Sequence, residues 1–144
     1  MAVSYSNNWK NILTALMSKI KAEMKCPVFS DFNATSKANQ FIRLVPRGST
    51  LVDLATFIEV REFDIGVQYF FLNRQNKEFQ NYVLNQVSIL EALIHDNIKL
   101  TLADSTEFVN VSFDNLELNV EIDEYEDYFV AEWTLTGTHF GNAA

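Results

Sequence analysis

Few side chains in this sequence could carry out covalent chemistry. The chain of 144 residues has two histidines, His95 and His139, and one thiol, Cys26. A nucleophilic serine or cysteine needs a base within hydrogen-bond reach, and no motif brings either histidine to such a partner. His95 is expected at the carboxyl end of a helix, where a positive charge is favourable. Cys26 has no Cys-x-x-Cys partner and is expected to be a buried or half-buried, inert thiol.

Four carboxylates in the stretch DEYED, residues 123–127, could in principle bind calcium. The stretch lacks the glycine and the spaced oxygen ligands of an EF-hand loop. Paired carboxylates of a glycosidase need an enclosed site that raises one pKa, and the pattern predicts no enclosure. Neither glycine-rich phosphate-binding motif is present. We therefore expect no metal, no cofactor and no enzymatic activity.

Composition and length favour one globular domain over residues 1–144. Hydrophobic residues make up 48% of the chain and aromatic residues 13%, which suits a sheet with a packed core. No apolar run approaches the length of a membrane span, and the first ten residues lack the pattern of a signal peptide. We expect no membrane association. The single cysteine excludes an internal disulfide and fits a reducing compartment.

Charge is distributed unevenly along the sequence. Residues 1–90 carry ten basic and seven acidic residues, a balance of +3, whereas residues 91–144 carry one basic and twelve acidic residues, a balance of −11. Such an acidic half argues against wrapping nucleic acid. Surfaces of opposite sign could meet head to tail between copies and close a ring. The alternative is that the acidic residues only keep the surface soluble.

Two segments have the spacing of amphipathic helices. In the first, residues 7–24, apolar residues recur every three or four positions, with Ser6 or Asn7 as a cap and Cys26-Pro27 as a stop. Its outer face carries lysines, which fit a solvated surface or, alternatively, a membrane surface or a partner protein. The second segment runs from about Asn73 to Asp96, with a similar apolar stripe.

The remaining segments alternate as strands do. Strands are predicted at 28–32, at 41–45, at 55–72 and from 128 to about 140. Alternation puts one face of the third strand on the core, with Phe63, Ile65, Val67, Tyr69 and Phe71, and one side of the last strand carries Phe129, Ala131, Trp133, Leu135 and Gly137. A bulge near Val60-Arg61 would bring Ile58 and Val60 to the same buried face. Residues 98–104 could be a short strand or an extended connection, and residues 107–122 one broken strand or two. The sequence thus predicts an α+β fold with a mixed, mostly antiparallel sheet. The elements follow one another in the order α-β-β-β-α-β-β. The two helices pack on one face of the sheet, and a long strand or hairpin protrudes.

The string LVPRGS, residues 44–49, is also the thrombin-cleavable linker of many recombinant proteins. Such a linker normally lies at a chain end beside a histidine run, and here 43 residues precede it. Proline cannot donate to a sheet ladder. We therefore interpret the string as native, with Pro46 ending a strand and Arg47-Gly48-Ser49 forming a turn.

Residues 41–71, FIRLVPRGSTLVDLATFIEVREFDIGVQYFF, resemble tail terminator proteins of tailed bacteriophages, also called tail completion proteins. In that family a short I-R-[IL]-x-P strand leads through a loop into a long R-E-[FY]-x-[IV] strand that ends in aromatic residues. The matching positions are Ile42, Arg43, Leu44, Pro46, Arg61, Glu62, Phe63 and Ile65. Both helices and the acidic hairpin also resemble the family, from about Trp9 to Thr138.

The resemblance implies a virion protein, assembled in the host cytoplasm, that forms a ring, commonly a hexamer. The ring would cap the head-proximal end of the tail tube, stop its polymerisation and offer a surface to the connector of the neck. DNA would pass through the lumen without being bound, and no cofactor is implied. Alternatives are a head-tail connector, a tube-like protein or a non-catalytic acidic adaptor domain.

Candidate contact residues follow from the charge pattern. The acidic hairpin could meet a basic surface of a neighbouring copy or of the tail tube, or it could be a solvated turn that protects a sheet edge. The candidates on the basic and acidic sides of such an interface are Arg47, Arg61, Arg74, Lys77, Asp123, Glu124, Glu126 and Asp127.

Overall fold

Over the residues that the structure describes, the fold is a six-stranded sheet with two helices. The computed structural model describes residues 7–30, 38–55, 58–72, 77–120 and 128–142. The elements are α1 (Asn8–Met24), β1 (Val28–Phe29), β2 (Gln40–Leu54), β3 (Ile58–Leu72), α2 (Phe79–Asp96), β4 (Lys99–Thr101), β5 (Glu107–Val120) and β6 (Tyr128–Asn142).

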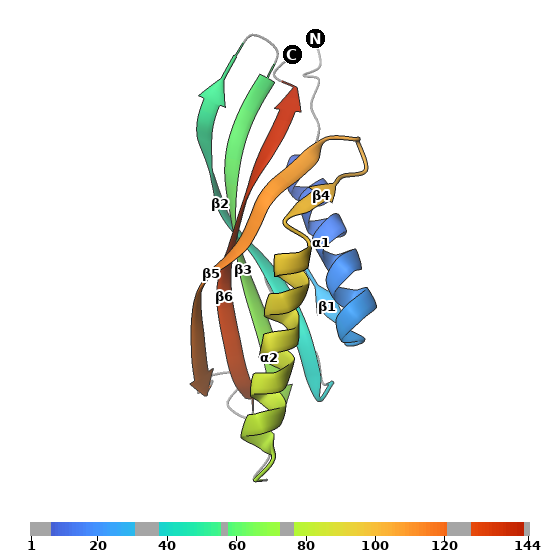
Figure 1. Cartoon of the computed structure of the whole chain (residues 1–144), viewed down its shortest axis with the longest axis vertical. Coiled ribbons are helices and arrows are strands. Elements are labelled where there is room, and N and C mark those ends of the chain that lie inside the picture. Colours follow the sequence, from blue (N-terminus) through green and yellow to red (C-terminus); the bar gives the residue numbers. More distant parts are fainter. Residues whose placement is uncertain (1–6, 31–37, 56–57, 73–76, 121–127, 143–144) are drawn as a thin grey trace.

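The sheet has the strand order β1-β2-β3-β6-β5-β4, and all neighbouring pairs are antiparallel except β1–β2 (Figure 1). The predicted fold class is confirmed. Residues 99–101 form a strand, and residues 107–120 form one strand with an irregularity between Asp114 and Leu116. The predicted first strand is shorter in the structure, ending at Phe29.

Both helices form where the apolar spacing predicts, although α2 begins at Phe79, later than the predicted start near Asn73. Asn7 caps α1 by accepting a hydrogen bond from the backbone N–H of Lys10 at 3.0 Å. The chain leaves α1 through Lys25 in the left-handed conformation, two residues before Pro27. Helix α2 ends at Asp96, and His95 lies exposed in its last turn, as predicted.

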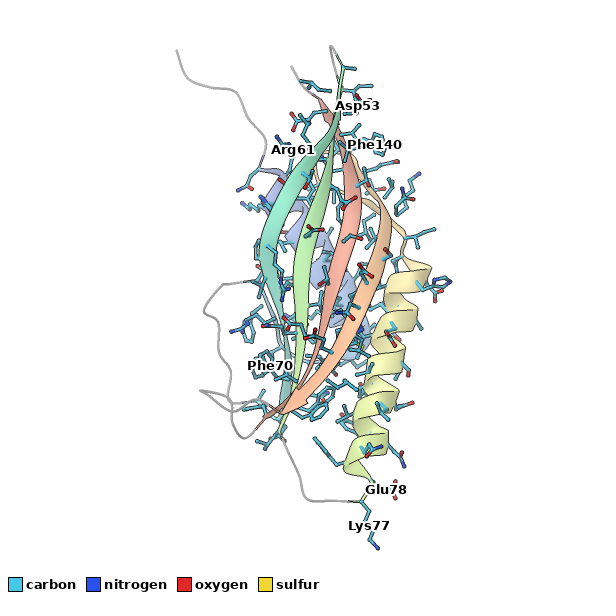
Figure 2. All side chains as sticks on the ribbon, turned by 90° about the vertical axis from the view of Figure 1, so that its left-hand side faces the viewer. Asp53, Arg61, Phe70, Lys77, Glu78 and Phe140 are labelled. Carbon is cyan, nitrogen blue, oxygen red and sulfur yellow. The ribbon has the colours of Figure 1, made fainter. Side chains whose placement is uncertain are left out.

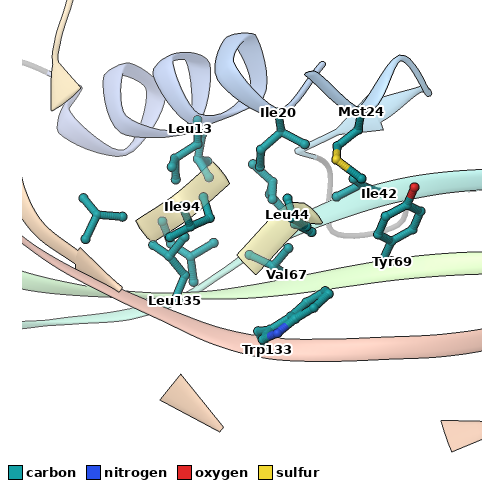
Figure 3. Close-up of a cluster of buried hydrophobic side chains, with 14 of the residues drawn as sticks. Leu13, Ile20, Met24, Ile42, Leu44, Val67, Tyr69, Ile94, Trp133 and Leu135 are labelled. Carbon is teal, nitrogen blue, oxygen red and sulfur yellow. The ribbon is translucent and has the colours of Figure 1, made fainter. Parts of the chain in front are cut away.

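One face of the sheet and both helices enclose the main core. Side chains of α1 point at the sheet (Figure 3). Ile20 lies above Leu44 and Met24 above Ile42, whereas Leu13 lies above Ile94 (Figure 3). From β3, β6 and α2 the core receives further fully or almost fully buried side chains, among them Ile65, Val67, Tyr69, Leu90, Trp133 and Leu135. The residues that share this face were predicted from strand alternation on β3 and β6.

Strand β2 continues through LVPRGS, so the predicted strand end at Pro46 is wrong. Ile42 donates its N–H outward to the carbonyl of Pro27 at 2.9 Å. Donors alternate in direction along a strand, and the register has no shift between Ile42 and Pro46. The nitrogen of Pro46 therefore lies on the outer edge of β2, where no ladder hydrogen bond is lost. Arg47 is the extra residue of a bulge.

The predicted bulge in β3 is also wrong, because β3 pairs with β6 without a register shift. The extra residue belongs to the facing strand: Val52 of β2 lies between Leu51, opposite Arg61, and Asp53, opposite Val60. The bulge was invoked to bring Ile58 and Val60 to the buried face. They remain on the other face because side chains alternate along β3 without interruption, and no helix covers this part of the described strand (Figure 1).

Three strands project beyond the helices at one end of the molecule (Figure 1). We call this projection the arm and define it as residues 49–54 of β2, 58–62 of β3 and 138–142 of β6. Trp9, at the start of α1, packs edge-on against Phe63 with ring centroids 4.8 Å apart. The arm begins just past this contact, and it is the predicted protruding hairpin.

Candidate functional site

The face of the sheet opposite the helices carries a row of polar side chains, and Figure 2 looks onto this face. Arg43, Gln68 and Glu132 stand opposite one another on β2, β3 and β6, and Glu117 of β5 continues the row. Arg43 Nε donates to Gln68 Oε1 at 2.8 Å, and Gln68 Nε2 donates to Glu132 Oε2 at 2.9 Å. The row therefore cross-links three strands.

Arg47 reaches this row from the bulge in β2. Its guanidinium crosses β3 at Gly66 and forms an ion pair with Glu132 on β6. A Cβ at position 66 would stand 2.4 Å from Arg47 Nε, so only glycine leaves room for the crossing. Glu132 and Glu117 oppose each other across the strands, and like charges in that position repel. The bulge thus delivers a cation to the place where two carboxylates meet.

An aromatic cluster adjoins the polar row at the end of the sheet away from the arm. Phe41 and Phe70 stack with centroids 4.5 Å apart, and Val130 is buried with them. Arg43 lies 5.3 Å from the centroid of the Phe70 ring, in cation–π geometry. This second core was not predicted, because strand alternation assigned a single buried face to β3.

Of the sequence-predicted contact residues, the three that the structure describes, Arg47, Arg61 and Lys77, do not form one patch. Arg47 is paired with Glu132, and Arg61 forms an ion pair with Glu59 of its own strand. Arg61 and Lys77 lie at opposite ends of the molecule (Figure 2). Arg74, Asp123, Glu124, Glu126 and Asp127 lie outside the described residues. The contact between the acidic hairpin and a basic surface stays a prediction.

A hydroxyl, an imidazole and a carboxylate meet at the base of the arm. Thr106 Oγ1 donates to Asp104 Oδ1 at 2.5 Å and lies 2.9 Å from His139 Nε2. Since the hydroxyl proton is directed at Asp104, His139 must donate to Oγ1 and cannot accept the hydroxyl proton. Burial lowers the pKa of His139, which is only 2% exposed. The arrangement anchors the β4–β5 turn to β6 and does not activate a nucleophile.

Cys26 is buried, as predicted. Burial raises the pKa of its thiol, and a hydrogen bond with Tyr69 opposes that shift. A protonated, covered thiol is a poor nucleophile. Burial also raises the pKa of Tyr69, which keeps the phenol neutral beside the thiol.

Within the described ranges, no three His, Cys, Asp or Glu side chains lie close enough to hold a metal ion. None of the helices described is both long and apolar enough to cross a membrane.

The arm exposes large apolar side chains, a feature that the sequence reasoning missed. Ten such residues are exposed in the described part of the chain, and five belong to the arm: Leu51, Val52, Leu54, Ile58 and Phe140. Their exposure ranges from 46% to 60%. Clustered apolar exposure of this kind marks interaction surfaces. The available signal was the change of apolar parity at Ile58 and Val60 in β3.

Comparison with known proteins finds a solved structure with a similar fold. No family model matches the chain, and no curated protein sequence matches it. Among solved structures, the fold matches a chain of the structure titled "Virion of native gene transfer agent (GTA) particle". The two chains are 12% identical, with a TM-score of 0.67, and the match covers 95% of this chain and 100% of the other. This protein therefore shares the fold of that virion chain over nearly its whole length.

Proposed function

We propose that this chain is a structural protein of a phage-like virion that forms a ring and caps the head-proximal end of a tail tube. In that role it stops tube polymerisation and presents a surface to the connector of the neck. DNA passes through the lumen without being bound. The protein is assembled in the host cytoplasm and resides in the virion, and it acts without a cofactor and without catalysis.

The observation that carries this proposal is the match in fold to a whole chain of a virion particle. The sequence resemblance to tail terminator proteins points to the same class independently of that match. The arm supports it further. Its five exposed apolar side chains are gathered at one end of the molecule (Figure 1), and exposed apolar surface of this kind is typical of a subunit that joins its neighbours.

Negative-stain microscopy of the purified chain tests the ring. Closed rings of uniform diameter are expected, whereas long tubes would indicate a tube protein and dispersed monomers an adaptor domain. Capping is tested separately by adding the chain during polymerisation of the tube protein from the same particle. Tubes should stop lengthening when the chain is present. Unchanged tube growth at saturating chain would contradict the capping role.

The acidic hairpin provides a test of its own. Replacing Asp123, Glu124, Glu126 and Asp127 with Asn or Gln should leave the fold intact and impair ring formation or capping if the hairpin meets a basic partner. Normal rings and normal capping from this variant would leave the hairpin as a solvated turn.

A further inference from the structure

The strand order separates the two charge halves of the sequence in space. Strands β1, β2 and β3, from the first half, lie on one side of the sheet, and β6, β5 and β4, from the second half, lie on the other. Figure 1 shows α1 along one side of the molecule and the carboxyl-terminal end of β5 along the opposite side. The charge difference along the sequence therefore becomes a difference between two sides of the molecule.

Helix α1 and its C-cap form the basic side. They carry four lysines, Lys10, Lys19, Lys21 and Lys25, against one carboxylate, Glu23. All four lysines are exposed, and none forms an ion pair with a described residue. Within the described part of the chain, the positive charge of this helix is therefore not neutralised.

The lysines divide between two flanks of the helix. Lys19 lines a groove beside β4, together with Ala15. Successive helical residues are rotated by about 100°, so Lys21 lies about 200° round the helix from Lys19. Lys10 precedes Lys21 by about three turns and Lys25 follows it by about one turn. We call these three residues, Lys10, Lys21 and Lys25, the lysine flank, and it faces away from the groove beside β4.

Helix α2 and strand β5 form the acidic side. Together they contain no lysine or arginine and five carboxylates: Glu91, Asp96, Glu107, Asp114 and Glu117. Glu91 of α2 lines a groove with Ser112 and Phe113 of β5, so the charges of the two elements adjoin. Glu107 is already paired with Lys99.

Strand β5 is partly uncovered along its outer edge. Strand β4 pairs with β5 as far as Val109, and the N–H of Val111 donates to the carbonyl of Ile98 at 3.1 Å. From residue 112 onward, β5 pairs with β6 and with no other described strand. We call residues 112–118 the β5 edge. Such an edge presents unpaired carbonyl groups, and the ammonium group of a lysine can donate to them.

Two carboxylates of the β5 edge have no cation. Asp114 and Glu117 are both exposed, and no described lysine or arginine forms an ion pair with either. Glu117 also stands opposite Glu132, and Arg47 pairs with Glu132 instead of Glu117. A cation from outside the subunit would relieve the repulsion between these like charges.

We propose that the lysine flank of one copy docks against the β5 edge of a second copy. Lys21 and Lys25 pair with Asp114 and Glu117 and donate to the carbonyl groups of the edge. The occupant is a second copy because each surface supplies the charge that the other lacks. The proposal rests on the proposed function, because it names the contact that joins the subunits of the ring.

The position of the two surfaces makes this contact head to tail. They lie on opposite sides of the molecule (Figure 1), so one two-fold interface cannot contain both. A two-fold contact would bring lysines against lysines or carboxylates against carboxylates, which is costly. A heterologous contact repeats from copy to copy and closes into a ring when the rotation allows. Exposed ion pairs are screened over about 8 Å at physiological ionic strength, so added salt should weaken association.

Charge reversal on each surface tests the contact. A flank variant carries Lys21→Glu and Lys25→Glu, and an edge variant carries Asp114→Lys and Glu117→Lys. At low salt, each variant alone should associate about 10-fold or more weakly than the wild type, as measured by sedimentation and native mass spectrometry. An equimolar mixture should assemble again, because every contact then joins opposite charges, and its rings should contain the two chains in equal numbers.

Lys19→Glu is the matched control for Lys21→Glu. The two residues are both exposed and lie two positions apart on one helix, on opposite flanks. Lys21→Glu alone should weaken association, whereas Lys19→Glu should assemble as the wild type does. Equal weakening by both would overturn the proposal, because the effect would then follow net charge and not a particular surface.

Three further results would overturn the proposal: a monomeric wild type, assembly of either double variant alone as readily as the wild type, or a mixture that stays dissociated. Melting curves check that each variant is folded, and all four reversed positions are exposed. If the variants behave as expected but wild-type rings fail to stop tube growth, the contact stands and the capping function fails. If rings cap tubes but tolerate both charge reversals, the capping function stands and the contact fails.

Discussion

Strands β2, β3 and β6 run through two regions of this molecule, the body that the helices cover and the arm. In the body, Leu44, Ile65 and Trp133 on β2, β3 and β6 are at most 1% exposed. In the arm, Leu54, Ile58 and Phe140 on the same strands are 60%, 50% and 47% exposed. The ladder between β3 and β6 is continuous from one region to the other. The backbone pairing of β3 with β6 is therefore the same in the body and in the arm, and the two regions differ in whether helices cover the sheet.

The difference shows that cover by the helices, and not strand formation, decides which apolar residues of the helix-side face form the main core. Burying one large aliphatic or aromatic side chain contributes about 1.5–3 kcal/mol. The arm forgoes that contribution at five positions. Strand pairing with the body holds the arm in place, so its apolar side chains remain available for a partner. The comparison predicts that substitutions in the body reduce stability, whereas substitutions in the arm reduce assembly.

The largest expected effect is that of Trp133→Ala. The indole of Trp133 stacks on Phe113 with centroids 4.9 Å apart, and Nε1 donates to Glu91 Oε2 of α2 at 3.2 Å. Truncation removes both the packing and the link to α2 and should lower the free energy of unfolding by about 3–5 kcal/mol. Denaturant unfolding of the wild type and the variant measures this change.

The matched control is Phe140→Ala on the same strand in the arm. Because Phe140 is exposed, its truncation should change the free energy of unfolding by no more than about 0.5 kcal/mol when measured under dissociating conditions. Equal losses for Trp133→Ala and Phe140→Ala would mean that the arm is part of the stabilising core, and the contrast between the two regions would fail.

A smaller, pH-dependent effect is expected at the boundary between the regions. The charged groups that act on His139 are Asp104 and Glu59, with Arg61 opposite it on β3, and burial is the dominant cause of its lowered pKa. The unfolded chain then binds a proton more readily than the folded chain. Stability from this group is fully present above the ordinary histidine pKa of about 6.5 and falls as the pH is lowered below it.

Replacing His139 with Gln should remove this part of the pH dependence between pH 7 and 5, whereas His95→Gln should retain it, since His139 is still present in that variant. Free energies of unfolding at a series of pH values give the comparison. Hydrogen bonding from Thr106 lowers the pKa of Asp104, so the contribution of that carboxylate is lost only at more acidic pH. If the free energy of unfolding of His139→Gln falls between pH 7 and 5 as steeply as that of the wild type, the pH dependence arises from another group.

Much of the fold could be predicted from local patterns. The apolar stripes of α1 and α2 and the alternation in β3 and β6 each depend on periodicity within one segment. The course of β2 could not be predicted, because proline and glycine normally mark a turn. Whether Pro46 ends a strand depends on which edge of β2 its nitrogen occupies, and the register of β2 against β3 decides that. This register depends on residues far apart in the sequence.

The candidate site was harder to predict for the same reason. Arg47 was singled out for its charge, yet its partner Glu132 lies 85 residues away in the sequence. The row of Arg43, Gln68 and Glu132 exists only once the register of three strands is known. The groove that Ala15 and Ser18 of α1 line together with Leu100 of β4 likewise joins two segments that lie far apart in the chain. The balance of basic and acidic residues along the sequence does not indicate this groove.

The smallest expected effect concerns the ion pair that crosses β3. Gly66→Ala would place a methyl group against the Arg47 guanidinium, at 2.4 Å from Nε. The arginine end is flexible, so it should move off Glu132 while the strands stay in place. Its side chain is 41% exposed, and ion pairs of this kind contribute about 0.2–1 kcal/mol. Gly66→Ala should therefore lower the free energy of unfolding by less than about 1 kcal/mol.

In an Arg47→Ala background the same change should lower the free energy of unfolding no further. Gly48→Ala on β2 is the control, because a Cβ there meets no atom within 4 Å and its backbone has no positive φ. Thermal unfolding of the four variants gives the coupling energy. If Gly66→Ala were as neutral as Gly48→Ala in the wild-type background, the crossing arginine would not hold the sheet together.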